Sequence, residues 1–225
     1  MKLDEVTPVL DVHPPHQSPH GWRDFLLHIF TITIGLFIAL SLEGIVEWQH
    51  HRHLAHEAER SLHAEVASNA SGIDGVLNDL HQKQATLKNT VAILNTIIAT
   101  KKLPPNHPQM SIDFRIVTFY SVSWKTAQAS GALSYMPYDD SQLYASIYSQ
   151  QELVTQSQQQ AARDTVMAIA PFMDDPDEKD APPSPQEATD VKQKVEILQA
   201  QYIIVESMMQ ALAAEYKKFL AAHPN

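Results

Sequence analysis

Apolar residues follow two different patterns along this chain, and the first is an unbroken run. Residues 25–42 read FLLHIFTITIGLFIALSL and include no Asp, Glu, Lys or Arg. Extended back to Trp22, this run would form a helix about 31 Å long, which matches a bilayer hydrocarbon core of about 30 Å. Trp22 precedes the run and Trp48 follows it, as aromatic residues at the two membrane interfaces do. The pattern predicts a transmembrane helix over residues 22–42.

A cleaved signal peptide and the core helix of a soluble protein are the two alternatives to this span. A signal peptide has an apolar core of about 7–15 residues behind a basic segment. Here the apolar run is longer, and Lys2 and Arg23 are the basic residues before it, against four acidic ones. We therefore interpret the segment as a retained transmembrane helix.

The second pattern begins after the membrane segment and is periodic. Steps of four, then alternating steps of three and four, are typical of the apolar stripe of a long packed helix. This pattern predicts that the helix continues over 43–99 and ends before the prolines at 104–108. The stripe consists of Leu54, Ala58, Leu62, Val66, Asn69, Ile73, Val76, Leu80, Gln84, Leu87, Val91, Leu94 and Ile98.

Residues 111–120, SIDFRIVTFY, mix β-branched and aromatic residues and resemble a strand. The rest of the chain offers no second strand, and a single strand has nothing to pair with. We therefore predict a helix for this segment.

The second half of the chain returns to helical periodicity. We predict helices over 124–133, 141–172 and 187–222, with an acidic, proline-rich loop at 174–186 that lacks the residues to form a core. The last helix has the most regular heptads. These place Val191, Val195, Leu198, Tyr202, Val205, Met209, Leu212, Tyr216 and Leu220 on one face.

These elements predict an all-α protein in three parts. A Pro/His-rich tail at 1–21 precedes the transmembrane helix at 22–42, and residues 43–225 form an antiparallel helical bundle outside the membrane. The first bundle helix is longer than its partners. An intermolecular coiled coil would satisfy many of the same apolar positions, so this alternative stays open.

Composition and charge narrow the function classes. The net charge of −10 disfavours a nucleic-acid partner, because phosphate recognition needs a basic surface. The absence of cysteine excludes disulfides and thiolate metal ligands, and six glycines are few for a nucleotide-binding loop. The chain contains no P-loop, no G-x-S-x-G and no H-E-x-x-H. We therefore predict that it is not an enzyme, with no catalytic residue and no cofactor.

Small residues recur every fourth position inside the predicted span, at Thr31, Gly35 and Ala39. Such spacing lets two transmembrane helices approach closely, although small residues are also common in membrane helices. We expect this face to pack against another membrane protein or a second copy of the chain.

Histidines gather just after the span. His50, His53 and His56 are candidate metal ligands, with Glu57, Glu59 or Glu65 as an accompanying acid. Steps of three rotate the histidines around the helix, so they do not share one face. We interpret them as a collar that contacts lipid headgroups, and predict no metal.

A second candidate segment lies between the predicted bundle helices, in WKTAQASGALSYMP. Trp124, Gln128, Gly131 and Tyr135 would either line a pocket or form a close helix crossing, where small residues admit a neighbour. We favour the close crossing.

The blocks WRDFLLH, TITIGLFIALSLE and VEWQHHRH, from Trp22 to His53, resemble the N-terminal anchor of a family of uncharacterised bacterial single-span proteins. The later block SWKTAQASGALSYMP is similar to a second recurring segment of that family. This resemblance implies a bacterial membrane protein with a helical domain outside the membrane. It implies no activity and no functional residue.

Two function classes remain open. The first is a non-enzymatic accessory or scaffold subunit of another membrane protein or complex, for example a respiratory or photosynthetic one. The second is a sensory or ligand-binding bundle whose output a partner supplies. Within about twenty residues of the span, two basic residues lie on each side, Lys2 and Arg23 before it and Arg52 and Arg60 after it. Because long domains are exported regardless of charge, we predict an inner-membrane protein with a cytoplasmic N-terminus and a periplasmic bundle.

Overall fold

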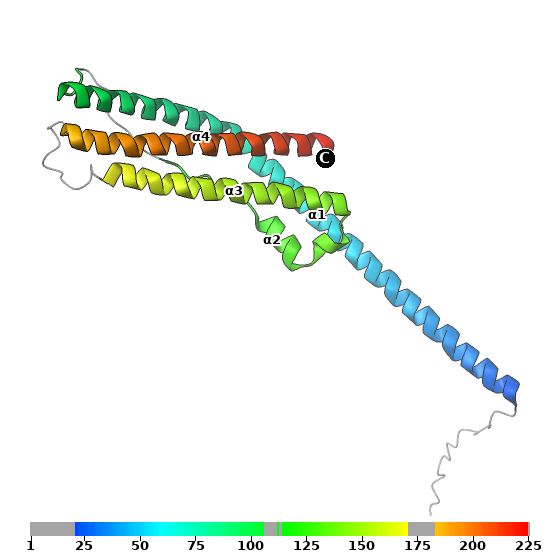
Figure 1. Ribbon diagram of the computed structural model, residues 1–225. Coiled ribbons are helices and arrows are strands. Elements are labelled where there is room, and N and C mark those ends of the chain that lie inside the picture. Colours follow the sequence, from blue (N-terminus) through cyan, green and yellow to red (C-terminus); the bar gives the residue numbers. More distant parts are fainter. Residues whose placement is uncertain (1–20, 106–111, 113, 171–182, 225) are drawn as a thin grey trace, which may run out of the picture. The chain divides into compact units, whose positions relative to one another are not determined.

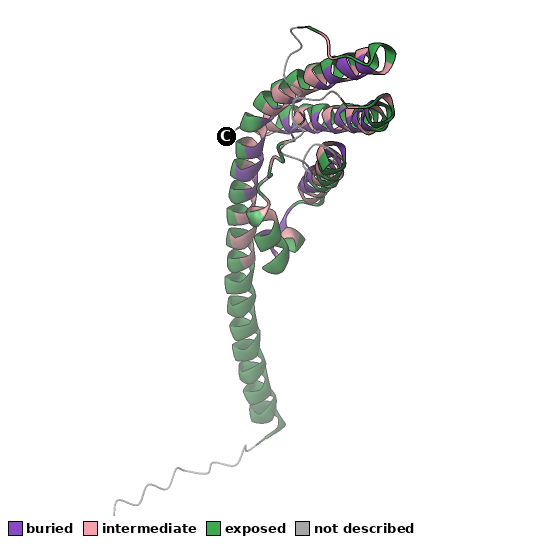
Figure 2. Ribbon diagram, turned by 90° about the vertical axis from the view of Figure 1, so that its left-hand side faces the viewer, coloured by how far each residue is buried: buried purple, intermediate pink, exposed green. Residues whose placement is uncertain are grey.

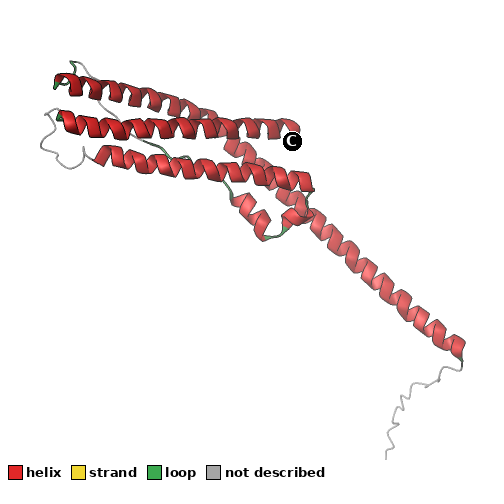
Figure 3. Cartoon of the chain, viewed as in Figure 1, coloured by secondary structure: helices red, strands yellow, loops and turns green. Residues whose placement is uncertain are grey.

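The computed structural model describes residues 21–105, 112, 114–170 and 183–224, and this part of the chain is all-α, without a strand (Figures 1 and 3). The predicted tail, apart from Gly21, and most of the acidic loop lie outside the described residues. The elements are α1 (Trp22–Thr100), α2 (Val122–Ala129), the short 3-10 helix η1 (Ala132–Tyr135), α3 (Tyr138–Ile169) and α4 (Pro185–Ala222).

The chain divides into two compact units, residues 1–50 and residues 51–225. The described residues of the first unit are the N-terminal part of α1. The second unit contains the rest of α1 together with α2, η1, α3 and α4. The predicted continuation of the membrane helix into the bundle is confirmed, because α1 is one helix of 79 residues.

Helices α1 and α4 are antiparallel in the second unit. His63 donates from Nε2 to the carbonyl of His223 at 2.8 Å, near the end of α4. Further along α1, His81 is paired with Glu206, which precedes His223 in α4. Residue numbers thus rise in α1 as they fall in α4, as the predicted bundle requires.

Helix α3 runs antiparallel to α4 and therefore in the same direction as α1. The Ser146 hydroxyl donates to Glu215 at 2.9 Å, and Asp140 lies 3.8 Å from His223. A parallel α1 and α3 need a connection that returns along the bundle. Residues 101–121 link α1 to α2, and the described residues Val117 and Tyr120 are bonded to α3 and to α1 respectively.

The core of the second unit consists of the predicted apolar stripes. Figure 2 shows the buried residues on the inner faces of the bundle helices. In α4 every predicted heptad position from Val191 to Tyr216 is buried, whereas Leu220 is half-buried and its neighbour Phe219 is buried. Because these side chains already pack within one chain, an intermolecular coiled coil is not needed to cover them.

The helix predicted over 111–120 is wrong. The described residues of that segment, Ile112 and 114–120, have no helical structure. The Gln158 side chain of α3 accepts from the Val117 N–H at 2.7 Å and donates to the Val117 carbonyl at 3.1 Å. The Asn69 side chain of α1 makes the same pair of bonds with the Tyr120 backbone, both at 2.8 Å.

These two amides explain why the prediction failed. A strand was rejected because the chain offers no second strand to satisfy its backbone. A side-chain amide has one acceptor and one donor group, so it can replace one residue of a neighbouring strand. Asn69 and Gln158 do so from two different helices, so the described part of the segment is neither a helix nor paired with a second strand.

Several helix ends differ from the prediction for local reasons. Helix α3 begins at Tyr138 rather than Ser141, directly after Pro137. Helix α4 begins at Pro185 rather than Glu187, since Ser184 and Glu187 form a capping box and Pro185 occupies the first turn. The helix predicted over 124–133 is divided in two by Gly131, whose φ of 73° lies in the left-handed region.

Candidate functional site

The N-terminal part of α1 has the surface of a membrane span. It belongs to the one described helix that is long and apolar enough to cross a membrane. All of residues 22–50 are exposed. The hydroxyls of Thr31, Thr33 and Ser41 donate to the carbonyls four residues earlier, at 2.7 to 2.8 Å. Each hydroxyl thus has a partner within its own helix, as an apolar solvent requires.

The predicted packing face in this segment is open. Thr31, Gly35 and Ala39 are exposed. A Cβ built on Gly35 meets no atom within 4 Å outside its own helix. The described chain therefore leaves room for a neighbouring backbone against this face.

A buried carboxylate forms the polar centre of the bundle. Glu65 of α1, 8 % exposed, accepts from the Tyr148 hydroxyl at 2.6 Å. The same carboxylate accepts from the backbone N–H of Ser123 at 2.8 Å and of Trp124 at 3.4 Å. Because Ser121 supplies no side-chain cap, Glu65 caps α2 from another helix.

Burial raises the pKa values of the tyrosines around this centre. Burial, then the hydrogen bond to Glu65, raises the pKa of Tyr148 far above its ordinary value. Burial likewise raises the pKa of Tyr216 from α4. Tyr148, which is protonated at neutral pH in any case, therefore keeps its proton and remains a donor at alkaline pH as well. Its ring stacks on Trp124 with centroids 4.9 Å apart, which adds a second link between α2 and α3.

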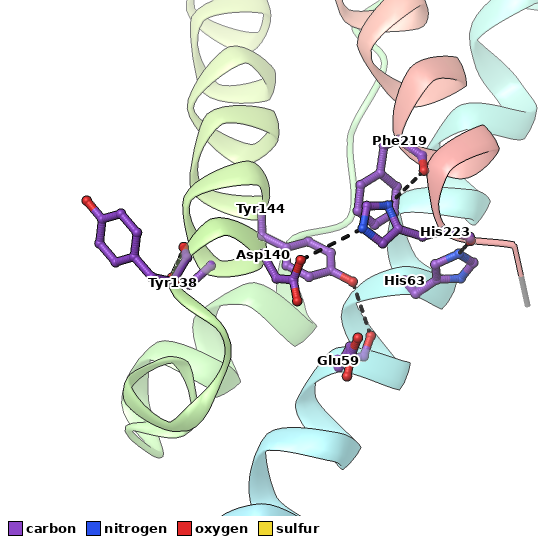
Figure 4. A network of polar contacts seen from close by, with 8 residues as sticks. Glu59, His63, Tyr138, Asp140, Tyr144, Phe219 and His223 are labelled. Carbon is purple, nitrogen blue, oxygen red and sulfur yellow. Dashed lines mark hydrogen bonds and ion pairs between the residues drawn. The ribbon is translucent and has the colours of Figure 1, made fainter.

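A second polar cluster joins the start of α3 and the end of α4 to the middle of α1 (Figure 4). His223 donates from Nδ1 to the Phe219 carbonyl at 3.0 Å, and its Nε2 lies 3.8 Å from Asp140. The Tyr144 hydroxyl donates to the Glu59 carbonyl at 3.4 Å, and burial raises the pKa of Tyr144 above its ordinary value. The cluster fastens the end of α4 to the other two helices.

The candidate metal ligands are not brought together. His53 pairs with Glu57 and His56 with Glu59, each at 3.5 Å and on the solvent side of α1. Glu65, the third acid considered, is bound to Tyr148 in the core. Among the residues that the structure describes, no three His, Asp or Glu side chains form a group that could hold a metal ion.

The four residues of the second candidate segment, Trp124, Gln128, Gly131 and Tyr135, also lie apart. Trp124 stacks on Tyr148, whereas Tyr135 stacks on His51 of α1 with centroids 3.8 Å apart. Gln128 is exposed, and Gly131 forms the turn between α2 and η1. They do not line one pocket.

A groove of about 290 Å³ does lie between α1 and α2. None of the four singled-out residues lines it, and its polar groups are hydroxyls and the Glu57 carboxylate. Its lining is Leu54, Glu57, Ala58, Ser61, Val122, Ser123, Thr126, Ala127 and Ser130.

The sequence pattern does not reveal the role of the three polar residues that organise the bundle, Glu65, Asn69 and Gln158. It suggests Glu65 only as a metal ligand, and it places Asn69 on the apolar stripe of α1 without assigning it a partner. A polar residue on such a stripe indicates a buried partner, because an unpaired amide in a core is costly. The partners come from distant segments, so the stripe alone could not identify them.

No protein-family model, curated protein or solved structure matches this chain. Its function is therefore argued from its own residues and their arrangement.

Proposed function

We propose that this chain is a non-enzymatic, membrane-anchored accessory or scaffold subunit that associates with another membrane protein or complex. Its span crosses the bacterial inner membrane once, with the N-terminus in the cytoplasm and the bundle in the periplasm. The partner packs against the Thr31–Gly35–Ala39 face of the span.

The observation that carries this proposal is the fully exposed first part of α1. A helix that only anchors a domain has no need of small residues, since lipid accepts Leu at every position. Here Gly35 leaves its face open to a second backbone, and the neighbouring Thr31 hydroxyl is already bonded to Leu27 of the same helix. The face is therefore both small and free of unsatisfied donors.

The use of buried polar groups supports a structural rather than a catalytic role. Glu65, Asn69 and Gln158 are each bonded to backbone groups of the segment 117–124. A catalytic acid or base has to reach a substrate, whereas these side chains hold one part of the chain against another.

The test is affinity purification in a mild detergent, with the recovered complex or homo-oligomer as the readout. Gly35→Leu should keep the helix in the membrane, because the substitution raises its hydrophobicity, yet reduce recovery of the partner. Gly44→Leu is the matched control. It adds the same side chain nine residues further on, about 180° around the helix, and should leave recovery unchanged.

A surface variant of the bundle distinguishes the other route of association. Leu198 is buried, so a charge there would unfold the bundle, whereas Ile204 is 49 % exposed on α4. If Ile204→Asp abolishes assembly and Gly35→Leu does not, the partner binds the bundle. A small molecule that co-purifies without any protein partner would favour the sensory alternative.

Orientation is tested separately, with a reporter that is active only outside the cytoplasm and is fused after Asn225. An active fusion agrees with a periplasmic bundle. An inactive but stably produced fusion reverses the assignment.

A further inference from the structure

The loop that contains η1 is held against α1 by an aromatic stack. The ring of Tyr135 lies on the ring of His51 with centroids 3.8 Å apart and planes 10° from parallel. The left-handed backbone of Gly131 ends α2 and turns the chain into η1, which places Tyr135 at this position. The loop at 131–138 is thus fixed beside His51.

His51 lies close to the end of the membrane segment along the chain. Trp22 and Trp48 are 26 positions apart in α1, about 39 Å, which matches a bilayer including its headgroups, about 40–45 Å. His51 follows Trp48 by three residues, or about 4.5 Å along the helix. This estimate counts residues along one helix, and it places His51 close to the outer edge of the headgroups.

The loop presents side chains suited to that depth. Tyr138 is 75 % exposed and Tyr135 is 47 % exposed. Tyrosine has an apolar ring with a polar tip, and it is enriched where hydrocarbon meets headgroups. Residues 131–138 include no Lys or Arg, and two acidic residues, Asp139 and Asp140, follow directly. The loop therefore has no positive charge of its own to attract anionic lipid.

We propose that the loop at 131–138 contacts the membrane surface beside the span, through Tyr135 and Tyr138, and that it binds a zwitterionic lipid surface. The inference rests on the proposed membrane anchor. It gives the domain a second point of attachment, which would limit rotation of the bundle about the span.

The absence of cysteine allows a direct test. The full chain is reconstituted in phosphatidylcholine vesicles in which a fraction of the lipids carries a nitroxide on the headgroup. A single Ser134→Cys, in the loop, is labelled with a fluorophore. The matched control is Ser207→Cys, also exposed but about 24 Å along α4 from His223, which lies near the loop. Gln49→Cys, next to Trp48, reports insertion of the span.

We expect the label at position 134 to be quenched several-fold more than the label at 207, at low and at high salt alike. Replacing both Tyr135 and Tyr138 by Ser in the Ser134→Cys chain should reduce that quenching, with an unchanged helical circular dichroism spectrum. Unchanged quenching in this variant overturns the role of the tyrosines.

The label at position 49 separates the two hypotheses. If 49 is quenched while 134 resembles 207, the lipid contact of the loop is wrong and the anchor stands. If 49 is not quenched, the anchor itself is wrong, and the loop inference is wrong with it. Quenching at 134 that requires anionic lipid, or disappears at high salt, overturns the zwitterionic assignment.

Discussion

The side-chain amide of Asn69 and the backbone of Tyr120 form a closed pair of hydrogen bonds, each 2.8 Å long, between two segments 51 residues apart. The pair has the donor and acceptor pattern of two adjacent strand residues, with an amide side chain in place of one backbone. It fastens the returning segment to α1 just before α2 begins. The position of α2 therefore depends on Asn69, a residue of α1 whose role is structural.

Asn69→Ala should destabilise the bundle by about 1–3 kcal/mol, because it leaves a partly buried N–H and carbonyl of Tyr120 without their partner. The measurement is denaturant unfolding of the full chain in detergent micelles. Asn78→Ala, at an exposed position of the same helix, is the control for helix propensity and should have little effect. Equal stability of the two variants would show that the amide pair contributes nothing.

Tyr148→Phe should cost about 1–3 kcal/mol, since the buried Glu65 carboxylate loses its side-chain donor while the ring stack on Trp124 is retained. Tyr138→Phe removes a hydroxyl from an exposed ring and serves as the control. Hydrogen exchange of the α2 amides should rise in the first variant only. Unchanged exchange there would mean that Glu65 does not hold α2.

Gly131→Ala should destabilise the protein by about 1–2 kcal/mol, because φ at this residue is 73° and L side chains are strained in that region. A Cβ at Gly131 meets nothing within 4 Å, so the cost is in the backbone alone. Gly72→Ala, in the middle of α1, also adds a Cβ in open space but should stabilise by about 0.5–1 kcal/mol. Thermal unfolding tests this prediction, because the two variants should change the stability of the protein in opposite directions.

The capping box of α4 should make its N-terminus sensitive to acid. Hydrogen bonds from the side chain and backbone of Ser184 lower the pKa of Glu187 below its ordinary value of 4.5. A carboxyl whose pKa is lowered by folding stabilises the folded state above its unfolded pKa, and this stabilisation is lost as the pH falls through the folded pKa. The protection factors of the amides in the first turn of α4, which correct for the intrinsic pH dependence of exchange, should therefore fall below about pH 4.5.

Glu187→Gln is the control for this pH dependence, because it keeps the shape of the side chain and removes its titration. The variant should show no extra loss of protection between pH 4.5 and the folded pKa. An identical acid response in both proteins would assign the effect to other carboxylates.

Local pattern determined the helices and the candidate span. The charge-free run at 25–42 and the heptads from Val191 to Tyr216 both involve residues a few positions apart. Helix formation and amphipathic burial depend on this short spacing, so the sequence alone predicted an all-α chain with one long first helix. The same spacing explains why α4 was predicted to within two residues of its start.

Only the tertiary structure decided how the segment between α1 and α2 is held and which side chains form the polar centre. Asn69 bonds Tyr120, Gln158 bonds Val117, and Glu65 bonds Tyr148 across separations of 41 to 83 residues. A hydrogen bond between distant segments leaves no periodic trace in either of them. The sequence therefore predicts a helix for the segment at 111–120, because the amides that bond the backbone of its described residues belong to helices that only folding brings beside it.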